Sequence, residues 1–129
     1  MEQITVTVPV PPNVLSPNGR GVWPQRARAA KALRADAKRA AQQAMGPRWW
    51  EWDTWRGRVW VTIRWCAPGR MPDLDNAAAR CKPALDGIVD AGLMADDNQV
   101  AGMRIERGPV NGRPRVELVL THEAPGEVT

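Results

Sequence analysis

A chain of 129 residues has the length of one domain, so we expect a single domain over residues 1–129. Hydrophobic residues make up 43% of it and charged residues 25%, proportions of a soluble globular protein that exclude wholesale disorder. No apolar run reaches the roughly 20 residues that cross a bilayer, and Met1–Pro12 lacks the pattern of a secretory signal. We therefore expect a cytoplasmic protein without a membrane partner.

The formal net charge of +4 is unevenly distributed, because many of the arginines and lysines fall between Arg20 and Arg70. Charge concentrated in this way favours a polyanionic partner, with a solvated helix face as the alternative. The two cysteines, Cys66 and Cys81, lack the spacing of a zinc site, and we expect both to be small buried side chains.

The first predicted element is a strand over residues 4–8, where β-branched residues alternate and predict one buried face. The strand ends at Pro9. The stretch 11–21 is rich in proline, glycine and asparagine, residues that restrict φ or favour turns, and it predicts a loop.

A helix is predicted from about Gln25 to Met45, where Ala, Arg, Lys and Gln dominate and Gly46-Pro47 supplies a stop. Its apolar stripe consists mostly of alanine, which permits close packing on a sheet. The rest of its surface is basic enough to lie along phosphates, and a solubilising surface is the alternative.

Tryptophan is the sole aromatic residue type in the chain, and four of the seven tryptophans lie at Trp49, Trp50, Trp52 and Trp55. We expect this cluster to form a dimer contact or a lid on the core, rather than a platform for base stacking. Alternating residues 59–66 then predict a second strand, which Pro68-Gly69 ends.

Two carboxylates, Asp73 and Asp75, follow this strand two residues apart. In an extended backbone that spacing places both on one side, where they would present oxygen ligands to one hard cation, while Leu74 points into the core. The alternative is a passive acidic loop or a helix cap, for which Asp75 or Asn76 is suitable.

Lys82 lies in the same segment, where a positive charge would steady the transition state of phosphodiester cleavage; its alternative is an ordinary surface lysine. Pro83 follows directly. Because proline removes a hydrogen bond from a helix interior, we expect a break there, with Pro83 in the first turn of a helix that continues through Leu85 and Ile88 to Val89.

A second acidic pair, Asp96-Asp97, precedes the next strand. We expect the chain to return so that Asp97 converges with Asp73 and Asp75. Three carboxylates around one or two Mg²⁺ ions would orient water for attack on a phosphodiester and neutralise the charge that develops on the phosphorus oxygens.

The C-terminal part predicts two strands, residues 100–107 and 115–121, joined by a loop with turn residues as an antiparallel hairpin. The tail after His122 is polar, and we expect it to be frayed. His122, the single histidine, is expected to be exposed to solvent and without a catalytic role.

Several motifs follow one another along the chain: Asp73-Leu74-Asp75-Asn76, Lys82 with Asp86 four residues on, Ala91-Gly92, Asp96-Asp97 and Gln99-Val100. The opening Val8-Pro9-Val10-Pro11-Pro12-Asn13 precedes them. In this order the chain resembles the RusA family of Holliday-junction resolvases over most of its length. The acidic block is the specific part of the resemblance, whereas the basic helix and the tryptophans are not diagnostic.

The resemblance implies a homodimeric, Mg²⁺-dependent endodeoxyribonuclease that nicks four-way DNA junctions on opposing strands, in recombination and repair. By position, Asp73, Asp75 and Asp97 resemble the metal-binding catalytic aspartates of that family, and Lys82 its essential lysine. The chain departs from the pattern by about three extra residues before Lys82, so Arg80 is a second candidate for that role. We assign supporting roles to Asn76, Asp86 and Asp96.

The predicted fold is an α/β (α+β) domain, with a mixed sheet of about four strands and two main helices in the order β, α, β, α, β, β. The alternatives are a non-catalytic DNA-binding module of phage origin and a Mg²⁺-dependent nuclease of flaps or single strands. The residues expected to contact DNA are basic: Arg20, Arg26, Arg28, Lys31, Arg34, Lys38, Arg70 and Arg80.

Overall fold

Four strands and two long helices follow one another in the predicted order. The computed structural model describes residues 2–17 and 23–126, so Arg20 lies outside the described residues. Short 3-10 turns lie at Asn13–Leu15 (η1), Trp49–Glu51 (η2) and Asp97–Gln99 (η3). The main elements are β1 (Glu2–Val8), α1 (Trp23–Met45), β2 (Arg58–Cys66), α2 (Leu74–Asp90), β3 (Val100–Arg107) and β4 (Arg115–Glu123).

The strands form one mixed sheet in the order β1-β4-β2-β3. β4 pairs antiparallel with both β1 and β2, whereas β3 pairs parallel with β2. The predicted hairpin between β3 and β4 is therefore wrong. The helix between β2 and β3 makes these two strands run parallel, as in other strand–helix–strand units. β4 pairs with the opposite side of β2, so β2 lies between β3 and β4.

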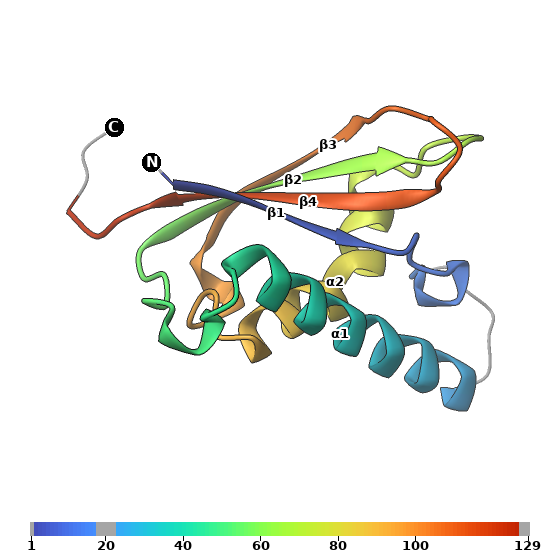
Figure 1. Ribbon diagram of the computed structural model, residues 1–129. Helices are drawn as coiled ribbons and strands as arrows, with labels where there is room; N and C mark the ends of the chain where they lie inside the picture. Colours follow the sequence, from blue (N-terminus) through green and yellow to red (C-terminus); the bar gives the residue numbers. More distant parts are fainter. Residues whose placement is uncertain (1, 18–22, 127–129) are drawn as a thin grey trace.

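Both helices cover the same face of the sheet, and the other face is uncovered (Figure 1). The covered face presents alternate residues of each strand, among them Val6, Val61, Ile63 and Leu118, which are all buried. α1 packs against α2 and against β1, an edge strand of the sheet. The two helices approach closely at Gly87, where a Cβ atom would stand 2.2 Å from the backbone oxygen of Arg34.

α1 confirms the predicted helix, beginning two residues earlier and ending at Met45, with Gly46 in the positive-φ conformation (109°) that favours glycine at a helix end. α2 differs from the prediction, because Pro83 lies inside a continuous helix. An interior proline costs about 3 kcal/mol. Burial of Leu85 and Ile88 on the same helix offsets this cost, since each contributes about 1.5–3 kcal/mol.

The C-terminal end of the sheet is more ordered than expected. His122 is 6% exposed and stacks on Trp55, with ring centroids 4.8 Å apart and planes at 10°. Its Nε2 atom contacts the carbonyl oxygen of Arg56 at 2.5 Å. The prediction of an exposed His122 is wrong, as is that of a frayed tail directly after it, because β4 runs through the buried Glu123.

Both cysteines are buried, as predicted. Burial raises the pKa of the Cys81 thiol to about 12, so the thiol stays protonated at neutral pH. Within residues 2–17 and 23–126, neither long helix is apolar over a length that would cross a bilayer.

Candidate active site

The first acidic pair lies at the beginning of α2. Asp73 is the N-cap residue, with an extended backbone, and its side chain accepts a hydrogen bond from the Asn76 backbone N–H at 3.0 Å. Asp75 lies in the first helical turn, so the expected extended arrangement of the pair is wrong. Leu74 is 42% exposed instead of buried, because helix geometry turns it away from the sheet. The capping bond explains the difference, since it stabilises the helix from this point.

Lys82 links two carboxylates from different parts of the chain. Its ammonium group donates to Asp86 Oδ1 at 2.7 Å, one turn along α2, and to Asp97 Oδ2, which precedes β3. The hydrogen bonds to Asp86 and to Asp97 raise the pKa of Lys82, and the bond from Lys82 lowers the pKa of Asp97. Both partners are therefore charged at neutral pH, and a positive charge is held between two negative ones.

The backbone around Asp97 is held by a capping box. The Asp96 side chain accepts from the Asn98 N–H at 3.0 Å, and the Gln99 side-chain oxygen accepts from the Asp96 N–H at 2.9 Å. The Gln99 amide also donates to the backbone oxygens of Trp55 and Gly57, which lie just before β2. Gln99 is a positioning residue that the sequence reasoning missed, although Asp96-x-x-Gln99 has the capping-box spacing.

Three charged residues, Asp75, Lys82 and Asp86, lie on one side of α2. Asp75 and Lys82 are seven residues apart, which is nearly two turns and about 10 Å along the helix axis. Asp86 follows Lys82 by about one further turn. Asp97 contacts this same side through Lys82. One stripe of α2 thus carries Asp75, Lys82 and Asp86, with Asp97 beside it.

The donor atoms at the start of α2 fit a hard divalent cation. Asn76 Oδ1 is buried without a hydrogen-bond partner, next to the exposed carboxylates of Asp73 and Asp75. Carboxylate and amide oxygens are the ligands that Mg²⁺ accepts in proteins. Among the residues that the structure describes, no three His, Cys, Asp or Glu side chains gather closely enough to hold one ion. The expected convergence of Asp73, Asp75 and Asp97 is thus not preformed in the protein alone.

Three of the basic residues expected to contact DNA are engaged within the protein. Arg34 donates two hydrogen bonds to the Asp90 carboxylate, at 2.6 and 2.8 Å, and this bidentate pair joins α1 to α2. Arg26 donates to the carbonyl oxygens around η1. The Arg80 guanidinium donates to the Pro11 carbonyl oxygen and lies 5.0 Å from the ring centroid of Trp65. Arg80 is therefore held against the start of the loop after β1, whereas Lys82 faces Asp97.

The remaining basic candidates in the described part of the chain are exposed side chains: Arg28, Lys31, Lys38 and Arg70.

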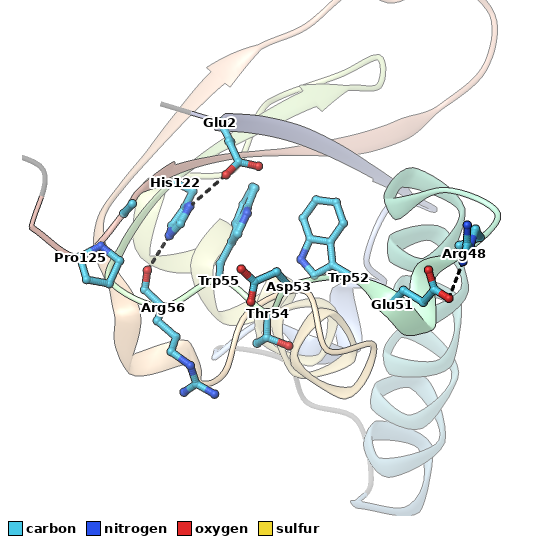
Figure 2. Close-up of a pocket in the computed structure, with 11 residues that line it drawn as sticks. Glu2, Arg48, Glu51, Trp52, Asp53, Thr54, Trp55, Arg56, His122 and Pro125 are labelled. Carbon is cyan, nitrogen blue, oxygen red and sulfur yellow. Dashed lines mark hydrogen bonds and ion pairs between the residues drawn. The ribbon is translucent and has the colours of Figure 1, made fainter.

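The tryptophan cluster closes one end of the core. Trp55 is 3% exposed and Trp52, which donates to the Leu93 carbonyl oxygen, is half-buried, as a lid on the core requires. Trp50 is 65% exposed and meets Trp49 edge to face. Figure 2 shows Trp52, Trp55 and His122 along a cavity of about 630 Å³, with Glu2 directed at His122.

The fold and this arrangement define a small α+β protein with an acidic site around one lysine. The family model of endodeoxyribonuclease RusA matches residues 12–121, and the chain belongs to that family. It is also 34% identical over 122 residues to an uncharacterized protein of Xylella fastidiosa (strain Temecula1 / ATCC 700964), a match that covers 91% of this chain and 75% of the relative. Membership in this family indicates an endodeoxyribonuclease in general terms.

Proposed function

We propose that the protein is a Mg²⁺-dependent endodeoxyribonuclease that resolves four-way DNA junctions by paired symmetric nicks, in recombination and repair. The observation that carries this proposal is the link from Lys82 to Asp97. It joins the segment before β3 to the stripe of α2 that begins with the first acidic pair. The family match over residues 12–121 supports the same reaction class.

Asp73, Asp75 and Asp97 would hold the ion, with Asn76 as a further oxygen donor. When bound, Mg²⁺ supplies a positive centre that orients water and offsets charge on the phosphate oxygens. Because the pKa of Asp97 is lowered by Lys82, this carboxylate is ionised and competent as a ligand at neutral pH. The binding groups come from two segments, so DNA and metal are expected to draw them together.

Lys82 would act directly on the reacting phosphate. Its ammonium group remains protonated, and its 53% exposed side chain is accessible to an approaching phosphate. Asp86 holds the ammonium group in place, and Asp96 with Gln99 holds the backbone of Asp97. A positive group at this position stabilises the negative charge that increases in the transition state.

A homodimer is part of the proposal, because paired nicks in a two-fold symmetric junction need two active sites related by the same symmetry. Sedimentation of the 14.3 kDa chain should then give twice that mass. A monomer that stays monomeric on junction DNA would contradict paired cleavage.

The central experiment compares cleavage of a synthetic four-way junction, a flap and a linear duplex with Mg²⁺. We expect symmetric nicks in the junction alone. Asp75→Asn should abolish nicking and retain binding, whereas Asp53→Asn, an exposed aspartate on the tryptophan side, should cut like the wild type. Cleavage of flaps in preference to junctions would favour the flap nuclease, and binding without any cleavage would favour the non-catalytic module.

A further inference from the structure

Trp23 is the most exposed of the large apolar side chains in the described part of the chain, at 77%. It is the first residue of α1, and its indole has an open face to water. An isolated exposed tryptophan on a soluble protein is unfavourable by its apolar area, and tryptophan is enriched where a partner covers it. The residues around Trp23 indicate the chemistry of the partner that would cover it.

A hollow of about 280 Å³ lies between α1 and α2 beside this indole. The hollow is mostly apolar, and Lys82 lies on its wall. It is just below the 300–1,000 Å³ of sites that hold drug-sized ligands, a size that suits a single flat ring system. The residues that line it are Leu15, Trp23, Arg26, Ala27, Ala30, Ala79, Lys82 and Pro83.

Two positively charged side chains lie on its walls, Arg26 and Lys82. Arg26 donates to the carbonyl oxygens of Val14 and Ser16, which holds the η1 segment as one wall. Pro83 contributes a ring that is fixed within α2. Arg26 and Lys82 both line the hollow, so one cation lies on its α1 side and another on its α2 side. An apolar slot bordered by cations matches a nucleic acid strand, whose bases are flat and whose backbone is anionic.

We propose that Trp23 stacks on a nucleobase that is unstacked at the branch point of the bound DNA and occupies the hollow beside Lys82. This inference rests on the proposed function and adds a contact that selects branched DNA. Bases next to a crossover lack a continuous stack on one side, so displacing one costs less there than within a duplex. The contact would also seat the neighbouring phosphate near Lys82, which faces Asp86 and Asp97.

Equilibrium binding without Mg²⁺ tests the proposal on a four-way junction and on a linear duplex with the same arm sequences. Trp23→Ala should weaken junction binding about 5- to 150-fold, which corresponds to about 1–3 kcal/mol, and change duplex binding less than about twofold. Trp23→Phe should restore most of the affinity. Trp60→Ala removes a 42% exposed tryptophan from the uncovered sheet face and should bind the junction like the wild type.

A cross-link gives direct evidence of contact, which a loss of stability cannot imitate. 5-Iododeoxyuridine at the branch point should cross-link to Trp23 on irradiation, and the same base placed inside an arm should not. Full junction affinity of Trp23→Ala, or equal weakening for junction and duplex, would overturn the stacking contact. If the wild type nicks the junction in that case, the proposed function stands; if the wild type binds no DNA, both proposals fail.

Discussion

Removal of the Lys82 charge should separate the catalytic contribution of this residue from its contribution to stability. Lys82→Met keeps a similar side-chain length and breaks the contacts with Asp86 and Asp97. The three side chains are 53%, 32% and 34% exposed, so water screens both pairs. Exposed ion pairs contribute about 0–1 kcal/mol, and two pairs that share one charge should not exceed about 1 kcal/mol in total.

For a domain of this size, a loss of 1 kcal/mol corresponds to a Tm decrease of about 3–6 °C. The effect on nicking should be larger, because loss of one group that stabilises transition-state charge lowers kcat by about 10²–10³. The assays are thermal unfolding and single-turnover nicking of a four-way junction at saturating protein. Arg104→Met is the matched control, since it breaks an exposed 3.0 Å ion pair with Glu106 and should nick normally.

The pH dependence of the same variant follows from the pKa shifts. The pKa of Asp97 is lowered in the folded protein. The stability that ionised Asp97 contributes is therefore present above the unfolded pKa of about 3.9 and is lost as the pH falls through the lower folded pKa. The pKa of Lys82 is raised in the folded protein, so the stability that protonated Lys82 contributes is lost only when the pH rises through that raised pKa. The stability difference between wild type and Lys82→Met should be constant between about pH 5 and 9. Wild-type nicking rates in Lys82→Met, or a stability loss above about 3 kcal/mol, would refute the reasoning.

Three further predictions concern packing, the buried thiol and the basic helix. Gly87→Ala should destabilise the protein by about 1–3 kcal/mol despite the better helix propensity of alanine, because the added methyl group would lie 2.2 Å from the backbone oxygen of Arg34. Denaturant unfolding measures the change, and unchanged stability would contradict the close approach of the helices. Cys81 should resist alkylation in the folded protein at pH 8, because its pKa is raised to about 12. The thiol ionises more readily in the unfolded chain, so the free energy of unfolding should fall by about 1.4 kcal/mol between pH 8 and pH 10, and Cys81→Ala should lack this decrease. Lys31→Gln should lower the slope of log K against log salt for junction binding by about one, whereas Arg34→Gln should mainly reduce stability, because Arg34 is bound to Asp90; equal slopes in both variants would argue against this division.

The sequence by itself predicted the fold class and the order of the strands and the two main helices. Local patterns were sufficient to predict α1, because strong helix formers and the stop at Gly46 act within a few residues. They were also sufficient to predict β2, because alternating residues indicate a strand with one buried face. The order of motifs from Asp73 to Val100 was sufficient for the family, which the match over residues 12–121 confirms.

Only the tertiary structure decided how these elements pair and which side chains meet. The pairing of β3 with β2 depends on the crossover through α2, and the continuity of α2 past Pro83 depends on burial against the rest of the core. His122 is buried because β4 lies inside the sheet, next to Trp55. The contact of Lys82 with Asp97 joins residues 15 positions apart. Such contacts depend on the summed packing of distant segments, so no local pattern of residues encodes them.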